Sequence, residues 1–450
     1  MQEFILEKEQ KIPVYAETDV LVVGGGPAGF AAAVSAARSG AKVILMERYG
    51  YLGGMATGGY VLLLDCLDDG KGNLVIKGVV EELVERLKKI NGIIGPEKDI
   101  WGSSDIDQIT HWRQWAGTGG EDKIIRYSPV VDPELMKCVC NNMAEEAGVQ
   151  FLLHSLFCKT YIEDNAVKGA IFESKSGRQV VLAKVVIDCT GDGDVFASAG
   201  AGFDEGDLPL GLVFRVGNID NDKAEEYLKV AENGKKISDD IKKLGGIAGG
   251  YSFGILPQGF FMRSSIPNVV WFNNTTKGSA INVDDLIRVE IETRKRMMIT
   301  VDYFKANVPG FENAVIIDTA PQLGTRSSRM LDGEYVITRK ELHEGKRFED
   351  AVVVAQPPYK NFKPEDALKQ IPYRCFLPKK IDNLLVAGRC ISGDFGAIEM
   401  LRVIPTAMLM GQACGVAAAL AVKEDKAPRN VEVKEIQNVL RSQNVYLPEV

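Results

Sequence analysis

The sequence predicts an α/β protein in which a domain with a parallel sheet is interrupted by an inserted α+β domain. Three observations predict it. An apolar run, a glycine-rich turn and a helix-compatible segment follow one another within residues 19–39. Two further apolar runs end in glycine-rich turns, at 185–193 and at 383–393. The chain has 450 residues, which is more than one small core needs and suits two domains.

Composition and charge narrow the class of protein. Hydrophobic residues make up 46% of the chain and charged residues 25%, which is the balance of a globular protein with a large core. The net charge of −8 disfavours binding to nucleic acid, because phosphate backbones repel an acidic surface. The eight cysteines form no CxxC pair, and residues 1–18 contain no signal-peptide pattern, so we expect a cytoplasmic protein.

One apolar segment, at 405–422, is long enough to cross a membrane. It consists mainly of Ala, Gly and Met, it contains Gln412, and it closely follows Arg402. These features favour a helix buried inside an α/β domain, and we expect no membrane partner.

The first strand–turn–helix unit carries a nucleotide-binding motif. The strand DVLVV at 19–23 leads into Gly24-Gly25-Gly26-Pro27-Ala28-Gly29, and a second strand follows at 42–46. Gly24 permits the tight turn, Gly26 lets the backbone approach a pyrophosphate, and Gly29 lets the helix pack on the strand. The start of the helix supplies N–H donors and a positive dipole end for the phosphates. The spacing therefore predicts a Rossmann-type dinucleotide site.

Glu47 completes this site. It ends the second strand, eighteen residues after Gly29, where a carboxylate can accept hydrogen bonds from a ribose 2′-OH. FAD and NAD share this spacing. Two features favour FAD: the glycine run at 52–59, which includes Gly53, Gly54 and Met55, and the loop at 388–402 before the last apolar helix. The start of that helix suits the anionic edge of a flavin.

The remaining pattern gives the domain boundaries. We expect a helix at 134–147 with Asp132 as its N-cap and Gly148 as its stop, and a long amphipathic helix at 283–307. Further strands are expected at 149–153, 167–173, 179–182, 185–189, 333–338 and 351–355. The FAD-binding domain is assigned to 1–60, 130–205 and 376–450, and the substrate domain to 61–129 and 206–375.

Several segments of the chain resemble a known family of proteins. The segments VVGGGPAGFAAAVSAARSGAKVILMER and LGGMATGG are similar to the glutathione-reductase-type FAD fold with a single Rossmann domain. The segments at 320–338 and 383–421 resemble the broad bacterial family of FAD-dependent oxidoreductases. The resemblance covers about 17–205 and 315–422, and it implies an enzyme whose cofactor is FAD.

The resemblance also implies roles for single residues. The three motif glycines would hold the pyrophosphate, Glu47 the adenosine ribose, and the residues after it the phosphates and ribityl chain. Thr190, Gly191 and Asp192 match a second cofactor turn, Gly393 and Asp394 match an element that meets the ribityl hydroxyls, and Thr406 would place the last helix against the flavin. The full set is Gly24, Gly26, Pro27, Ala28, Gly29, Glu47, Arg48, Gly53, Gly54, Met55, Thr190, Gly191, Asp192, Gly393, Asp394, Arg402 and Thr406.

One departure from the family pattern concerns the loop at 394–396. Relatives often carry Thr-His-Glu there, whereas this chain has Asp394-Phe395-Gly396. A catalytic role of that histidine in relatives does not transfer to this protein.

Four residues are candidates for contact with the substrate. Arg326 and Arg329 flank two serines in the family-like segment, and arginine binds carboxylates bidentately; the alternative is an internal ion-pair network. Tyr373 is a candidate proton donor or a packed core residue. His111 lies among tryptophans, where a packing role is the alternative. For Arg402 a structural role and flavin contact are equally supported.

The expected function is hydride transfer between flavin N5 and a small organic substrate. A substrate that bears a carboxylate group is one option. A flavin monooxygenase and a non-catalytic FAD- or nucleotide-binding protein are the alternatives. We expect O₂ or an external electron carrier as a further reactant, and the sequence leaves homo-oligomer formation open. It contains no HExxH motif and no Cys/His spacing typical of a metal site.

Overall fold

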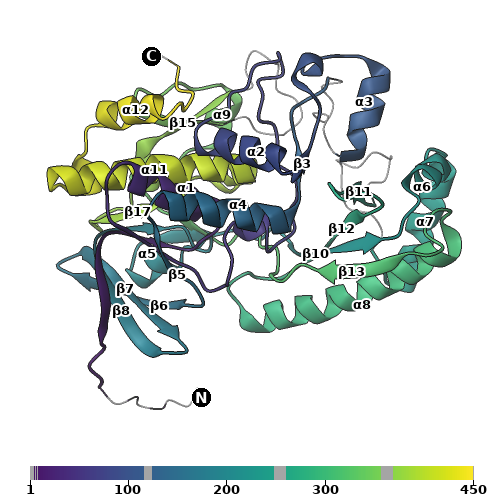
Figure 1. Ribbon diagram of the computed structural model, residues 1–450. Coiled ribbons are helices and arrows are strands. Elements are labelled where there is room, and N and C mark those ends of the chain that lie inside the picture. The colour runs from purple at the N-terminus through teal and green to yellow at the C-terminus, as the bar shows by residue number, and fades with distance from the viewer. Residues whose placement is uncertain are drawn as a thin grey trace.

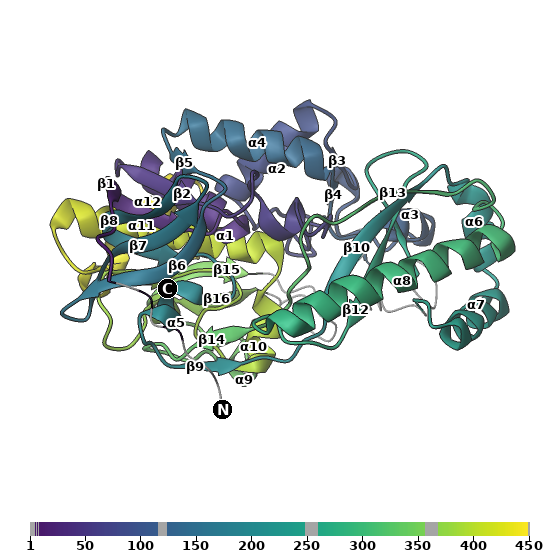
Figure 2. The same cartoon turned by 90° about the horizontal axis from the view of Figure 1, so that it is seen from below.

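The computed structural model describes residues 5, 7, 9–115, 124–247, 260–355 and 368–448. It has two regions that lie side by side (Figures 1 and 2). The larger region is a layered α/β structure that contains the described residues near both chain ends. The smaller region is built on a second sheet and a long helix.

The larger region is built on a seven-stranded sheet in which five strands are parallel. Their order is β5 (Gln150–Leu152), β2 (Val43–Met46), β1 (Val14–Val23), β8 (Gly177–Asp188) and β17 (Leu384–Val386). The antiparallel strands β7 (Ala166–Ser174) and β6 (Leu156–Glu163) extend it. β8 is one continuous strand where the sequence analysis expected two. The parallel strands are apolar runs buried on both faces, as expected when helices cover a sheet.

The parallel strands end on one line. Val23 at the end of β1 pairs with Met46 of β2 and with Asp188 of β8, and Asp188 also pairs with Val386 of β17. The residues that follow these strands therefore meet at one edge of the sheet. Because the chain passes from β1 to β2 on one side, while β8 lies on the other, this edge is the switch point at which such sheets bind ligands.

Helices α1 (Pro27–Arg38) and α11 (Ile404–Glu424) cover one face of this sheet (Figure 1). Their backbones touch. A Cβ atom on Gly411 would lie 1.9 Å from the carbonyl oxygen of Ala28, and one on Gly415 would lie 2.3 Å from that of Ala32. Only glycine permits this approach. The pairing of 28 with 411 and of 32 with 415 means that the two helices run in the same direction.

By length and apolar composition alone, α11 would qualify as a membrane span. Its 18-residue apolar window is 100% buried inside the protein, so α11 is a core helix here. It packs against α1, α2 (Val79–Lys89) and α12 (Val433–Ser442). α4 (Pro133–Glu146) packs beside α1, and Asp132 caps it as expected, accepting hydrogen bonds from the backbone N–H groups of residues 134 and 135.

The smaller region contains an antiparallel sheet in the order β11 (Met262–Arg263), β12 (Val270–Thr276), β10 (Leu210–Gly217) and β13 (Val315–Thr319). Helices α6 (Asn221–Leu228), α7 (Ala231–Leu244) and α8 (Val283–Asn307) pack with it; α8 has the bounds that the sequence predicts. The core between them is rich in phenylalanine. The rings of Phe214 and Phe272 stack at 4.9 Å, and Phe304 meets Phe272 edge-on at 5.5 Å.

The hydrophobic cores differ from the predicted domain boundaries. Apolar side chains between 64 and 87 and between 330 and 375, assigned above to the substrate domain, belong to the core around α1 and α11. One face of α2 and the whole of β15 (Ala351–Ala355) are buried there. The nucleotide motifs alone did not reveal this packing. A division into two domains stays a proposal, with the second domain closest to 203–319.

The other described elements are short. They are β3 (Ile93–Ile94), β4 (Val130–Val131), β9 (Phe203–Glu205), β14 (Arg329–Leu331), β16 (Lys369–Pro372), α3 (Ile106–Trp112), α5 (Asp194–Ser198), α9 (Arg339–His343) and α10 (Phe395–Leu401). The strand expected at 333–338 is absent from the described structure there. β14 and α9 lie before and after it, joined by residues with turn and bridge geometry.

The contact between α1 and α11 generates a stability prediction. Gly411→Ala forces the two helices apart, so we expect the free energy of unfolding to fall by about 2 kcal/mol or more, as in overpacked cores. Urea unfolding followed by circular dichroism measures it. Lys423→Ala, in the exposed last turn of the same helix, should change the stability by less than about 0.5 kcal/mol. Equal effects of the two substitutions would contradict the contact.

Candidate functional site

A cavity opens at the carboxyl edge of the parallel sheet. It is lined by the turns after β1, β2, β8 and β17 and by the first residues of α1 and α11. Twelve of the predicted cofactor residues line it: Gly24, Gly26, Pro27, Ala28, Glu47, Arg48, Gly54, Met55, Thr190, Gly191, Asp192 and Arg402. Gly29, Gly53, Gly393, Asp394 and Thr406 are not among its lining residues.

The glycine turn has the geometry that the motif predicts. Gly24 has φ +100°, and a Cβ there would lie 2.5 Å from the carbonyl oxygen of Cys189. A Cβ on Gly29 would lie 1.7 Å from the carbonyl oxygen of Gly24, so Gly29 lets α1 pack on the turn without lining the cavity. At Gly26, the N-cap of α1, nothing lies within 4 Å of a Cβ position, and no side chain caps the helix. The turn is therefore open beside Gly26, whereas the N–H groups of Gly24 and Gly25 are bonded to the Met46 carbonyl oxygen and to Glu47.

Glu47 is fixed by two backbone N–H groups. Gly25 donates to its Oε2 at 2.6 Å, and Tyr49 donates to its Oε1 at 2.9 Å. The side chain is only 9% exposed, and burial raises the pKa of its carboxyl, although these hydrogen bonds oppose the increase. Each carboxylate oxygen keeps a second lone pair, which can accept a ribose hydroxyl.

A second cavity adjoins the first and shares Gly24, Glu47, Arg48, Thr190 and Asp192 with it. Its far wall comes from the segment 155–157, which contains Ser155 and the first two residues of β6. The sequence analysis missed this segment. A strand was expected at 149–153, and in the structure β5 pairs in parallel with β2. The residues that follow β5 therefore lie at the same edge of the sheet as those that follow β2.

The second cofactor turn, at 190–192, is held by the buried Asp188. Its carboxylate accepts hydrogen bonds from the N–H and the hydroxyl of Thr190 and from the N–H groups of Val195 and Phe196. Val195 and Phe196 belong to the first turn of α5. The Asp188 carboxylate thus joins the turn to the start of α5 and has a structural role.

An ion-pair network surrounds this turn and decides the role of Arg329. Its Nη1 donates to Asp194 Oδ1 at 2.9 Å and to the carbonyl oxygen of Asp192. Arg389, which the sequence analysis missed, lines the cavity and forms an ion pair with Asp192 at 2.6 Å. Arg389 also donates to Thr325. Of the two readings left open for Arg329, the geometry favours the internal network.

The opposite end of the cavity is formed by the start of α11, where Ile404 and Ala407 line it. No side chain caps α11. Since Gly411 is level with Ala28, α11 extends about six residues, or about 9 Å, beyond the start of α1. The two helix N-termini therefore face different points along one groove.

Three of the predicted residues have other partners. Asp394 caps α10, accepting from the N–H of Ala397 at 2.7 Å, and also accepts from the N–H of Arg339. Gly393 forms a bridge with Ile337. Thr406 is buried in the first turns of α11. These positions shape the loop before α11 without lining the cavity.

The candidates for direct chemistry lie away from the cavity. The Tyr373 side chain is buried in the core, and its hydroxyl donates to the carbonyl oxygen of Pro428 at 2.9 Å. His111 is exposed on α3, where its ring contacts Trp112 at 5.0 Å. Arg326 is partly exposed and is not a lining residue, although its neighbour Thr325 is. Tyr373 and His111 therefore take the packing roles that were the alternatives.

Asp65 is a further carboxyl that the sequence analysis did not single out. Desolvation raises its pKa to about 7, and the positive charge of Arg402 opposes the increase. Arg402 itself lines the cavity. A group that gains a negative charge near pH 7 thus interacts electrostatically with an arginine of the cavity wall.

The smaller region reaches this cavity through the segment after β13. Gln322 and Thr325 line the cavity, and the N–H of Gln322 donates to the carbonyl oxygen of Gly58. Nearby, Tyr60 donates to Asp318, which also binds Arg215 through both carboxylate oxygens. These contacts fix the second sheet against the glycine-rich segment that follows β2.

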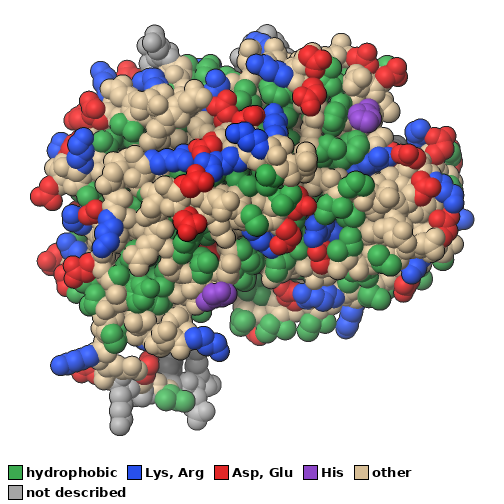
Figure 3. All heavy atoms as spheres, in the orientation of Figure 1, with side chains coloured by type: hydrophobic (Ala, Val, Ile, Leu, Met, Phe, Trp, Pro, Cys, Tyr) green, Lys and Arg blue, Asp and Glu red, His purple; other side chains and the backbone are tan. Residues whose placement is uncertain are grey.

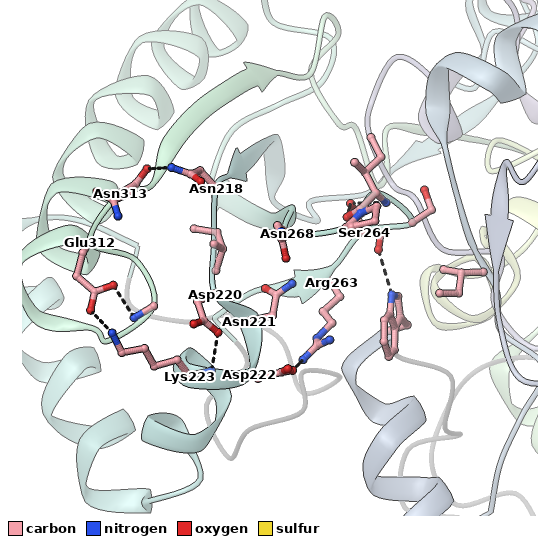
Figure 4. Close-up of a pocket in the computed structure, with 17 residues that line it drawn as sticks. Asn218, Asp220, Asn221, Asp222, Lys223, Arg263, Ser264, Asn268, Glu312 and Asn313 are labelled. Carbon is pink, nitrogen blue, oxygen red and sulfur yellow. Dashed lines mark hydrogen bonds and ion pairs between the residues drawn. The ribbon is translucent and has the colours of Figure 1, made fainter.

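The smaller region also has a cavity of its own, of about 630 Å³ (Figure 4). Its charged side chains bind one another: Lys223 pairs with Glu312 at 2.9 Å, and Arg263 pairs with Asp222 at 2.8 Å. None of the predicted cofactor or substrate residues lines it. Within the described residues, no group of three His, Cys, Asp or Glu side chains is placed to hold a metal ion.

The site fits an extended dinucleotide. It offers two uncapped helix N-termini, an open space beside Gly26, an acid placed for a ribose and two adjoining cavities. Helix N-termini attract anions such as a pyrophosphate. The residues that hold it in place are proposals for the tests below.

Comparison with known proteins shows which family the chain matches. The model of the family described as FAD dependent oxidoreductase matches residues 19–440. Dihydrolipoyl dehydrogenase of Buchnera aphidicola subsp. Acyrthosiphon pisum (strain APS) is 37% identical over 97 residues, which are 22% of this chain and 18% of that protein. Sarcosine oxidase subunit alpha of Corynebacterium sp. (strain P-1) is 58% identical over 41 residues, 9% of this chain and 4% of that protein.

Solved structures resemble the chain only distantly. A geranylgeranyl bacteriochlorophyll reductase-like protein from Thermoplasma acidophilum is 14% identical, with a TM-score of 0.46, over 95% of this chain and 83% of that one. The curated relatives match only a short part of their own length, so the activity and substrates of those proteins do not transfer.

Glu47 gives a binding prediction. Glu47→Gln puts an amide group where two N–H donors already point, so we expect the Kd of the apoprotein for FAD to rise about 10- to 100-fold. Titration of the apoprotein with FAD, followed by flavin fluorescence, measures the change. Glu163→Gln, an exposed strand-end acid, serves as the control. Wild-type affinity in the Glu47 variant would show that this carboxylate does not contact the cofactor.

Asp65 gives a pH prediction. With its pKa raised to about 7, its carboxyl is neutral below pH 7 and negative above it. The folded protein holds this proton more tightly than the unfolded chain, so this group's contribution to stability decreases as the pH rises from about 4 to 7. We expect the visible spectrum of bound flavin to change with a midpoint near pH 7. Asp65→Asn should abolish this change, and Asp107→Asn, an exposed control, should leave it; a midpoint that persists without Asp65 assigns it to another group.

Proposed function

Because the chain belongs to the FAD dependent oxidoreductase family, its cofactor being FAD, we propose that it oxidises or reduces a small organic molecule bound between the cofactor cavity and the second sheet. One observation carries this proposal. The cavity that contains the nucleotide motif is also lined by Gln322 and Thr325, which come from the segment after β13. A substrate in contact with the flavin end of this cavity would therefore touch both regions.

The residues present would hold FAD as follows. The N-terminus of α1 and the guanidinium of Arg48 would hold the pyrophosphate, Glu47 would accept from the adenosine ribose, and the segment 155–157 would bound the adenine. The N-terminus of α11 would stabilise negative charge on the isoalloxazine. When bound, FAD supplies hydride transfer at N5 of its ring system.

We assign the binding of an anionic substrate group to Arg402 rather than to Arg326 or Arg329. Arg329 is engaged by Asp194, and Arg326 lies outside the lining of the cavity. Arg402 lines the cavity beside the start of α11, at the end opposite to the glycine turn. A carboxylate bound there would be held by a charge-assisted hydrogen bond. Small carboxylic acids, amino acids and hydroxy acids among them, are therefore the first substrates to test.

In the proposed reaction the side chains orient the substrate and supply charge, and the flavin supplies the redox chemistry. Gln322 and Thr325 would orient the substrate through hydrogen bonds, and Arg402 would fix its carboxylate. Asp65, neutral below pH 7, would leave the charge of Arg402 available to the substrate and would partly neutralise it above pH 7. Substrate affinity should accordingly weaken as the pH rises past 7.

The test is anaerobic mixing of the purified protein with carboxylic acids and with the matching neutral alcohols. We expect loss of the visible flavin absorption with one class of acid. For that acid, Arg402→Ala should lower kcat/KM about 100-fold or more while FAD stays bound, the loss typical of a charged hydrogen bond.

Arg326→Ala is the matched control and should change kcat/KM by less than about three-fold. Bleaching by neutral compounds alone, or equal effects of the two arginine variants, would refute carboxylate binding at Arg402. Bleaching only by a nicotinamide nucleotide, with oxygen consumed in the presence of an organic substrate, would instead identify a monooxygenase.

A further inference from the structure

Helix α8 carries apolar side chains on its inner side and also on an exposed side, which lies about 100° around the helix axis from the first. The inner side packs on the second sheet through the buried residues Val289, Thr293, Met297, Val301 and Phe304. The exposed side carries aliphatic residues: Val283 is 65% exposed, Ile287 54%, Ile291 52% and Met298 49%. We call these four residues the outer stripe. Their spacing of four, four and seven residues places them on one face of the helix.

The sequence analysis described this helix as amphipathic. That description considered the apolar residues of the inner side and took the rest of the helix surface to be polar. Figures 1 and 2 show α8 along the margin of the smaller region with no element covering its outer side. In Figure 3 hydrophobic side chains lie among charged ones along that lower margin. Single exposed aliphatic residues are common, but four aligned on one helix mark a contact surface.

The charges on α8 are divided between its two halves. Residues 283–292 contain four acidic side chains and one basic one, whereas 293–302 contain three basic side chains and one acidic one. Local ion pairs neutralise some of them, such as Arg288 with Asp285 and Arg294 with Glu290. Among the residues that the structure describes, Asp284 and Lys295 form no ion pair, and both lie on the outer side near the stripe.

We propose that the outer stripe binds the outer stripe of a second copy of this chain, with the two α8 helices antiparallel about a two-fold axis. In that arrangement the acidic half of each helix faces the basic half of its partner. The midpoint between Asp284 and Lys295 coincides, within one residue, with the midpoint of the stripe near residue 290. One axis therefore satisfies both the apolar and the charged contacts, as an isologous interface requires.

The same charges disfavour a membrane as the occupant. α8 carries five acidic and five basic side chains, so it has no net attraction to an anionic lipid surface.

The size of the surface sets the expected affinity. The stripe spans 283–298, about 24 Å of helix, and would bury on the order of 500 Å² in total, which is small for a stable dimer. The expected association is therefore weak, with a Kd of tens of micromolar.

The first measurement is sedimentation velocity of the FAD-loaded full chain from about 1 to about 200 µM. We expect monomer at the low end and increasing dimer at the high end. Ile287→Glu with Ile291→Glu should raise the Kd at least about ten-fold. The control pair Val14→Glu with Val336→Glu adds the same charges at aliphatic positions that are 53% and 43% exposed in the larger region, and it should leave the Kd unchanged.

A charge exchange tests the antiparallel arrangement. Asp284→Lys and Lys295→Glu should each weaken the dimer, and the double variant should restore it, because each copy then offers both exchanged charges. This recovery cannot arise from damage to the fold. Retention of FAD and of the circular dichroism spectrum is checked for every variant.

Each result decides the proposal. A wild-type protein that stays monomeric throughout the range overturns it, as does a dimer that survives the Ile287/Ile291 variant. A dimer that the double charge variant fails to restore overturns the antiparallel pairing. A protein that remains monomeric but floats with phosphatidylcholine–phosphatidylserine vesicles assigns the stripe to a membrane surface instead.

Discussion

The rest of the cofactor site depends on the contact between the backbones of α1 and α11. Gly411 and Gly415 bring α11 against the carbonyl oxygens of Ala28 and Ala32, so that the two helices run in the same direction. Parallel helices at close range place their positive ends near each other, which is electrostatically unfavourable unless an anion lies between or beyond them. The pyrophosphate in the middle of FAD is such an anion. Its binding therefore relieves a repulsion that the protein's own packing creates.

A second constraint joins the two regions. The segment after the cofactor turn contains Tyr60 and Cys66, whose φ values of 52° and 47° are uncommon for residues other than glycine. Tyr60 is tied to Asp318, and the N–H of Cys66 donates to Ser128. Neighbouring contacts overdetermine this backbone, as is usual where an unfavourable conformation persists. These contacts hold the second sheet against the segment that follows β2, which lines the cavity through Gly54 and Met55.

Much of the cofactor site was predictable because its signals are local in sequence. A glycine that needs a positive φ, such as Gly24, and an acid at a strand end, such as Glu47, are visible as short motifs next to apolar runs. The sequence analysis failed where a role depends on tertiary contacts. The role of Arg389 is recognised only when Asp192 is seen beside it, and that of Tyr373 only when its hydroxyl is seen to donate a hydrogen bond to the carbonyl oxygen of Pro428.

The packing of α2 and β15 on the core around α1 and α11 was missed for the same reason. The apolar face of α2 and the buried strand β15 give no sign in sequence of which core they join. Asp65 is likewise an ordinary acid until the structure places it near Arg402. Burial and partners are properties of the folded chain, and a single sequence contains no alignment from which to infer them.

The pairing of β10 with β13 has a consequence for how such an enzyme diversifies. The chain leaves β10 at Gly217 and enters β13 at Val315, and these two residues are register partners in adjacent strands; the residues between them include β11 and β12 of the same sheet. Everything between them is an excursion whose two ends are hydrogen-bonded neighbours. Insertions and deletions within it change the loop-closure entropy only slowly with length and leave both anchoring strands in place. Evolution or an engineer could thus alter the segments between Gly217 and Val315 that lie outside β12 while β10 stays paired with β12 and β13.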